Sequence, residues 1–122
     1  MLASEQLKAN STSTIILLNS YGMGSAEEPL RLKLLRIYLA LLEENRFHPG
    51  AICFYGEGVK LVVQGSPVLD ALRALESKGV RLIVCVTCLK YYGLEEKVAV
   101  GIVGGMGDIM LAQWAAGKVI TL

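Results

Sequence analysis

Short apolar runs alternate with longer amphipathic segments along most of the 122-residue chain. Runs rich in Val, Ile and Leu with few interspersed polar residues are typical of strands buried on both faces of a parallel sheet. Runs of this kind, bounded by glycine, proline or polar residues, cover residues 13–19, 51–55, 80–86, 98–103 and 118–122. The pattern predicts these runs as the strands of one sheet.

Amphipathic segments separate these runs and predict helices over residues 30–45, 67–78 and 108–116. Residues 59–63 fit either a short helix or an extended segment, and residues 87–94 a turn or a short helix. Residues 1–12 predict a loose tail or a short helical turn, before a single domain that covers the whole chain. Strands that alternate with helices predict an α/β domain with a largely parallel sheet and right-handed crossovers.

The predicted helix over residues 30–45 is apolar around most of its circumference. Its apolar side chains cover roughly 200° of the helix surface, more than one sheet face covers. They are Leu34, Leu35, Ile37, Tyr38, Leu39, Leu41 and Leu42. We therefore expect a second copy of the chain to cover the remainder.

Composition agrees with self-association and gives no sign of a membrane or nucleic-acid partner. Hydrophobic residues make up 53% of the chain, and the mean hydropathy is +0.50. No apolar stretch approaches the length that spans a bilayer, and the polar first residues do not resemble a secretory leader, so we expect a cytoplasmic protein. A net charge of +1 provides no basic surface for nucleic acid.

Three cysteines without the spacing of a disulfide framework favour a reducing compartment and a catalytic or redox role. Cys85 falls at the carboxyl end of the run 80–86, where reactive groups of open parallel sheets collect, and Cys88 follows three residues later. Cys85 is therefore either a thiol for sulfur chemistry or a small buried apolar residue. Cys53 has apolar neighbours inside the run 51–55 and is expected to lie in the core.

Cys88 also has two interpretations. It either forms a disulfide with Cys85 or packs beneath the following loop. Thioredoxin-type proteins share the C-x-x-C spacing, but there the motif opens a longer helix than residues 87–94 allow. The one histidine, His48, is expected at the surface, and with no second cysteine pair we expect no metal site and no cofactor.

Two glycine-rich loops, at residues 22–24 and 104–107, follow predicted strands and precede predicted helices. Phosphate sites occur in this context, but neither loop has the spacing of a dinucleotide fingerprint or a P-loop. We expect them to form the walls of a pocket around Cys85, with Lys90, Lys60 or Arg31 as the basic group that favours the thiolate. The expected pocket residues are Gly22, Met23, Gly24, Lys60, Gly105 and Met106.

Six short motifs, in order along the chain from Ser13, resemble the DsrE/DsrF-like (YchN-like) sulfur-relay family, and within it the YedF-like subgroup of selenium metabolism. They are Met23-Gly24, Gly58-Val59-Lys60-Leu61, Gly65-Ser66-Pro67-Val68-Leu69, Cys85-Val86-Thr87-Cys88-Leu89, Tyr92-Gly93-Leu94 and Gly117-Lys118-Val119-Ile120-Thr121. The resemblance implies a three-layer α/β/α sandwich with a mostly parallel five-stranded sheet, assembled as a homo-oligomer such as a trimer or hexamer.

Relay members of this family carry sulfane sulfur as a persulfide on a cysteine that matches Cys85, and Cys88 matches a second cysteine of the YedF-like subgroup. The resemblance implies a sulfurtransferase-like carrier with Cys85 and Cys88 as catalytic residues and with donor and acceptor proteins as partners. The TusA-like N-terminal domain of that subgroup is missing from this sequence, which leaves open whether a separate donor is needed. The alternative is a non-catalytic oligomeric binding or redox-sensing module with structural cysteines.

Overall fold

The structure, a computed structural model, describes residues 2–122, with side chains from Glu5 onward. Five strands form a single sheet in the order β4-β3-β2-β1-β5, and every neighbouring pair is parallel. The strands are β1 (Thr14–Leu18), β2 (Ala51–Phe54), β3 (Arg81–Cys85), β4 (Ile102–Gly104) and β5 (Lys118–Thr121). The predicted α/β class and parallel five-stranded sheet are confirmed.

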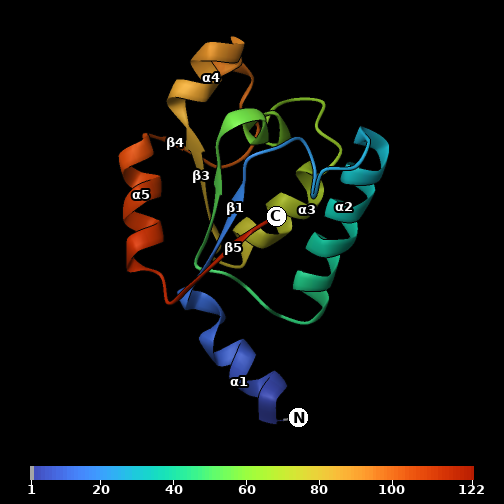
Figure 1. The fold of residues 1–122 in the computed structure, drawn as a ribbon, viewed down its shortest axis with the longest axis vertical. Helices are drawn as coiled ribbons and strands as arrows, with labels where there is room; N and C mark the ends of the chain where they lie inside the picture. The colour runs from blue at the N-terminus through green and yellow to red at the C-terminus, as the bar shows by residue number, and fades with distance from the viewer. Residues whose placement is uncertain (1) are drawn as a thin grey trace.

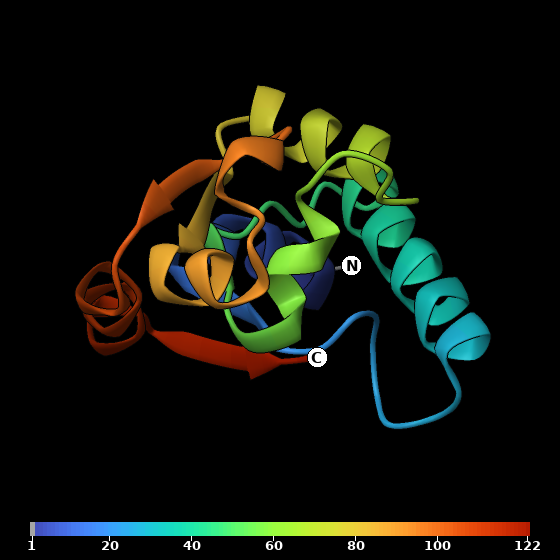
Figure 2. The same cartoon turned by 90° about the horizontal axis from the view of Figure 1, so that it is seen from above.

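Helices lie on both sides of the sheet. Two of them, α2 (Glu28–Glu44) and α3 (Leu69–Ser77), cover one side, and α5 (Met106–Ala115) lies on the other (Figure 1). The view from above shows the strands between these helices, so the domain has three layers, α/β/α (Figure 2). Along residues 2–122, no helix is both long and apolar enough to cross a membrane.

The chain begins with a helix, α1 (Leu2–Asn10), and a 3-10 turn, η1 (Ser11–Ser13), where the sequence predicted a loose tail or a short helical turn. Leucine, alanine, glutamate, glutamine and lysine, all strong helix formers, make up most of this segment, which accounts for the longer helix. In Figure 1, α1 lies at the end of the molecule where the strands begin, far from the carboxyl ends of β1 and β3.

Short helices cover the opposite end of the sheet. The 3-10 helix η2 (Gly56–Leu61) follows β2 directly, and α4 (Val86–Tyr92) follows β3 without a loop. Both segments that the sequence left open are thus helical, apart from the last two residues of each. A further 3-10 turn, η3 (Glu95–Lys97), comes after Gly93, which ends α4 in the left-handed conformation with φ 66°.

Two boundaries differ from the sequence prediction for local reasons. The predicted strand over residues 98–103 is shortened because Val98 forms an isolated antiparallel bridge with Val63 instead of joining the sheet. The helix predicted from residue 67 begins at Leu69, because Val68 is its N-cap, and the Val68 N–H donates to the Ser66 hydroxyl at 3.3 Å.

The core lies between the two faces of the sheet and the helices that cover them, but several apolar side chains of these helices are exposed to solvent. From α2, the side chains of Leu35, Leu39 and Leu42 are buried. Leu30, Leu34, Ile37 and Leu41 of the same helix are exposed. The prediction that one sheet face cannot cover this helix is therefore confirmed within a single chain. Further large apolar side chains are exposed on β4, α5 and β5, namely Ile102, Val103, Met106, Met110, Leu111, Trp114 and Val119.

Candidate functional site

Cys85 ends the third strand of the sheet at the edge where reactive groups of parallel sheets collect. It is also the residue before the first turn of α4, and in the register of β3 and β4 it lies beside Gly104. Because α4 begins at the next residue, the helix covers the end of the strand, and 0% of Cys85 is exposed. The thiol predicted to accept sulfur is therefore enclosed in the isolated chain.

Cys88 is the accessible thiol of the pair. It lies in the first turn of α4 and is partly exposed. Its sulfur accepts a hydrogen bond of 3.1 Å from the backbone N–H of Gly56, and its side chain is also hydrogen-bonded to Cys85. The structure thus brings the two cysteines together, with Cys88 outermost.

Gly56 is the residue that aims an amide at this sulfur. Its φ of 55° is left-handed, a conformation that glycine adopts without steric cost. A Cβ at this position would lie 3.1 Å from the carbonyl oxygen of Asn19. No local sequence pattern indicated that this amide faces Cys88.

The surroundings of Cys88 favour its protonated form. Burial raises the pKa of the Cys88 thiol, and the hydrogen bond to Cys85 raises it further, whereas the Gly56 N–H lowers it. An amide donor stabilises a thiolate more than a thiol, so this hydrogen bond strengthens when Cys88 loses its proton. The surroundings therefore favour the Cys88 thiol, and the Gly56 N–H stabilises the negative charge when the thiolate forms.

Cys53 belongs to the core, as the sequence predicted. It lies inside β2 between Leu17 and Ile83 of the neighbouring strands, and none of its surface is exposed. Burial raises the pKa of this thiol and the nearby Arg81 charge lowers it slightly, which leaves the pKa at about 11. Cys53 is thus unsuited to nucleophilic chemistry.

Lys60 connects η2 to α4 beside the cysteine pair. Its ammonium nitrogen lies 4.5 Å from the centre of the Tyr92 ring and 3.1 Å from a carboxylate oxygen of Glu57. Lys60 also lines a cavity of about 440 Å³ at this edge. The lining residues are Tyr21, Lys60, Val63, Gln64, Gly65, Ser66, Tyr92 and Leu94. Lys60 was expected at a pocket, whereas Tyr21 and Tyr92 were not singled out as site residues.

The first glycine-rich loop contributes less than predicted to this cavity. Arg31 holds the loop on α2, since its guanidinium donates to the carbonyl oxygens of Tyr21 and Ala26 at 3.3 and 2.7 Å. A Cβ on Gly22 would come within 2.5 Å of the Arg31 Cβ, so this glycine permits close packing. Met23 packs against the core and Gly24 is exposed. It is Tyr21, rather than Gly22, Met23 or Gly24, that reaches the cavity.

The second glycine-rich loop lies at the neighbouring edge strand. Gly105 precedes α5, and its N–H donates to the Asp108 carboxylate at 2.8 Å. Met106 begins α5 and is about half exposed. Gly104 places this loop next to Cys85 along the sheet edge, but Gly105 and Met106 do not line the cavity of Lys60, which lies on the α4 and η2 side.

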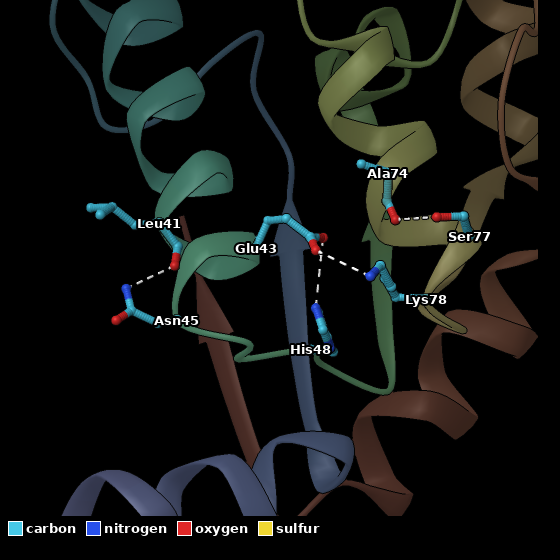
Figure 3. Close-up of polar contacts among 7 residues, drawn as sticks. All are labelled: Leu41, Glu43, Asn45, His48, Ala74, Ser77 and Lys78. Atoms are coloured by element: carbon cyan, nitrogen blue, oxygen red, sulfur yellow. Dashed lines mark hydrogen bonds and ion pairs between the residues drawn. The ribbon is translucent and has the colours of Figure 1, made fainter. Parts of the chain in front are cut away.

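His48 lies between α2 and β2, where its ring faces Glu43 (Figure 3). Its Nε2 is 3.6 Å from Glu43, and Lys78 approaches the other carboxylate oxygen of Glu43 at 3.8 Å. The imidazole is only 24% exposed, so the predicted surface residue is in fact part of a contact that joins α2 to the end of α3. Among residues 2–122, no group of three or more His, Cys, Asp or Glu side chains is arranged to hold a metal ion.

Similarity to other proteins agrees with this architecture. The ychN protein from E. coli has 19% sequence identity and a TM-score of 0.66, over 89% of this chain and 98% of that one. BT1422 from Bacteroides thetaiotaomicron, described as a conserved protein of unknown function, has 17% identity and a TM-score of 0.66, over 93% and 97%. MTH1491 from Methanobacterium thermoautotrophicum, also of unknown function, has 19% identity and a TM-score of 0.64, over 89% and 97%.

These structural likenesses show the fold, and a separate comparison shows the family. No curated protein matches the chain. The sequence profile of the DsrE/DsrF-like family matches residues 13–122, which include every strand of the sheet and both cysteines of the pair. The chain belongs to the DsrE/DsrF-like family.

Proposed function

We propose that this protein is a sulfurtransferase-like carrier that accepts sulfane sulfur on Cys88 and passes it to a partner protein. The observation that carries the proposal is the position of Cys88 at the carboxyl edge of the sheet, partly exposed and hydrogen-bonded to Gly56 and Cys85. Family membership supports sulfur relay as the class of chemistry. Cys85 was the acceptor expected from the sequence, but its complete burial favours Cys88 for the first step.

The transfer is a thiol–persulfide exchange. The Cys88 thiolate attacks the outer sulfur of a donor persulfide, the donor S–S bond breaks, and the donor thiolate leaves with the electron pair. Cys88 then holds the persulfide, while the Gly56 N–H stabilises its sulfur. An acceptor thiolate attacks the outer sulfur next, and the Cys88 thiolate is released.

Cys85 gives this carrier a way to discharge without an acceptor. Its thiolate attacks the inner sulfur of the Cys88 persulfide, forms a Cys85–Cys88 disulfide and expels the outer sulfur as hydrogen sulfide. The cysteine pair is oxidised and the sulfane sulfur is reduced, so the step needs no other reagent. A reducing compartment such as the cytoplasm then restores the two thiols.

Assembly into a homo-oligomer is part of the same proposal. Large apolar side chains are exposed on the outer face of α2 and on α5, and a second copy of the chain suits either face. Selenium is an alternative cargo, because a donor that carries it as R–S–SeH passes it to a thiolate by the same exchange: the donor S–Se bond breaks and the donor thiolate leaves with the electron pair.

A second candidate function is a redox-sensing module whose cysteines carry no sulfur. The contact between Cys88 and Cys85 favours it, because two neighbouring thiols form a disulfide on oxidation. Cyanide distinguishes the two functions: it removes sulfane sulfur as thiocyanate but yields none from a simple disulfide. Cys85→Ser, which lacks the resolving thiol, should release about one thiocyanate per chain after it is loaded with inorganic polysulfide and freed of excess. No thiocyanate from a protein with free thiols would rule out the carrier.

A further inference from the structure

The cavity lined by Lys60 and Tyr92 has no role in the sulfur transfer itself. Its polar lining groups are the hydroxyls of Tyr21, Ser66 and Tyr92, the side-chain amide of Gln64 and the Lys60 ammonium. No lining residue carries a carboxylate, and Lys60 is the one charged lining residue. A cavity of about 440 Å³ with this lining is large enough for a small organic molecule and favours one with a negative charge.

The cavity begins one helical turn from the Cys88 thiol. Cys88 and Tyr92 are four residues apart on α4 and therefore lie on the same face, roughly 6 Å apart along the helix axis. The preceding 3-10 helix contacts them in the same order, Gly56 at Cys88 and Lys60 at Tyr92. A ligand held by Lys60 can therefore extend along α4 to the sulfur of Cys88.

Lys60 is held in place before any ligand arrives. The Tyr92 ring supports its ammonium from one side, and Glu57 accepts one of its N–H groups. An ammonium has three donors, so further donors stay free for a ligand carboxylate. The Lys60 side chain is 36% exposed, which leaves its charged end reachable from solvent.

We propose that this cavity binds the carboxylate of a low-molecular-weight thiol and so positions the persulfide of that thiol for attack by Cys88. The inference rests on the proposed function and names the donor class for it. Thiosulfate has a single S–S bond of about 2 Å, which is too short to contact Lys60 and Cys88 together. A thiol of amino-acid to tripeptide size spans this separation and fits the cavity, with the two tyrosine rings against its aliphatic part.

The transfer from such a donor balances without an added reagent. Cys88 gives up its proton and attacks the outer sulfur of the donor persulfide, R–S–SH. The donor S–S bond breaks, and the R–S⁻ group takes the electron pair and then the proton. The products are R–SH and a persulfide on Cys88.

Glutathione provides a probe of binding that needs no sulfur transfer. We expect two-dimensional NMR of the reduced protein to show saturable shifts of Lys60, Ser66 and Tyr92 resonances with glutathione. Glutathione diethyl ester, which lacks free carboxylates, should bind about tenfold more weakly, as expected for loss of a charge-assisted hydrogen bond. Lys60→Met should weaken glutathione binding by a similar factor, and Lys33→Met, which removes an exposed charge from α2, should leave it unchanged.

Equal binding of glutathione and its ester to the wild-type chain would overturn the inference, and this comparison needs no variant to fold. Equal binding of glutathione to Lys60→Met and Lys33→Met would overturn it as well. Inorganic polysulfide, which carries no carboxylate, separates this failure from failure of the carrier function. If glutathione does not bind but polysulfide still places sulfur on Cys88, only the donor class is wrong. If neither occurs, both proposals are wrong.

Discussion

The backbone N–H of Gly56 donates a 3.1 Å hydrogen bond to the sulfur of Cys88, across 32 residues of sequence. The bond ties the start of η2 to the first turn of α4 over the carboxyl edge of the sheet. It also opposes the two effects that raise the pKa of this thiol, namely burial and the contact with Cys85. The chemistry of Cys88 therefore depends on the backbone of Gly56, not on a charged side chain.

Gly56→Ala should make Cys88 less acidic. Alanine is strained at a φ of 55°, so the backbone relaxes and the amide moves away from the sulfur. The pH midpoint for alkylation of Cys88 by iodoacetamide should rise, and the free energy of unfolding should fall by about 1–2 kcal/mol. Gly79→Ala is the matched control: it has a left-handed φ of 94° and open space around its Cβ. A midpoint unchanged in both variants would show that the Gly56 amide does not influence Cys88.

Removal of the inner thiol should have the opposite effect on Cys88. The hydrogen bond and charge interaction with Cys85 both raise the Cys88 pKa, so Cys85→Ala should lower the alkylation midpoint. At pH 7 the rate of alkylation should therefore increase, because a larger fraction of Cys88 is thiolate. Cys53→Ala serves as the control, since Cys53 lies in the middle of β2. The account is contradicted if Cys85→Ala slows alkylation of Cys88 at neutral pH.

The sequence was sufficient to predict the sheet and the cysteine pair, for physical reasons. A short, continuous apolar run such as the one that ends at Cys85 is typical of a strand buried on both faces of a sheet. The C-x-x-C spacing brings Cys88 close to Cys85 in either a turn or a short helix, the two structures expected for residues 87–94. Both predictions depend on short-range pattern alone.

Short-range sequence patterns could not predict how exposed each thiol is or where the cavity lies. Cys85 is covered because α4 begins at Val86, a helix start for which the sequence has no capping residue or proline. The Gly56 amide and the Tyr92 ring meet Cys88 and Lys60 through tertiary contacts. A clue was present in the four-residue spacing of Cys88 and Tyr92, which places both on one face of any helix.

Cys53 should make the protein sensitive to alkaline pH. Its pKa rises from 9.0 to about 11 on folding, so the unfolded chain loses this proton at a lower pH than the folded chain. Between these two values the stability should decrease by up to about 1.4 kcal/mol per pH unit from this group. Cys53→Val removes the titrating group, and urea denaturation at pH 8.5 and 10.5 measures the difference. Equal losses of stability in both proteins would contradict the assignment.

Self-association should depend on one of the two apolar faces. Trp114, 84% exposed on α5, and Ile37, 48% exposed on α2, mark these faces. A charge at a buried interface is costly, so Trp114→Glu or Ile37→Glu should reduce the mass measured by light scattering. The variant that changes the mass identifies the face involved. A wild-type monomer at micromolar concentration would contradict self-association.

Intact-mass analysis after incubation with inorganic polysulfide tests the central claim most directly. We expect the reduced wild-type protein and Cys53→Val to gain about 32 Da per sulfur atom, an adduct that dithiothreitol removes. Cys88→Ser should gain none, whereas Cys85→Ser should keep the adduct longer than the wild type because the resolving thiol is missing. An adduct that persists in Cys88→Ser and disappears in Cys85→Ser would contradict Cys88 as the acceptor, and no adduct on any protein with free thiols would contradict the carrier function itself.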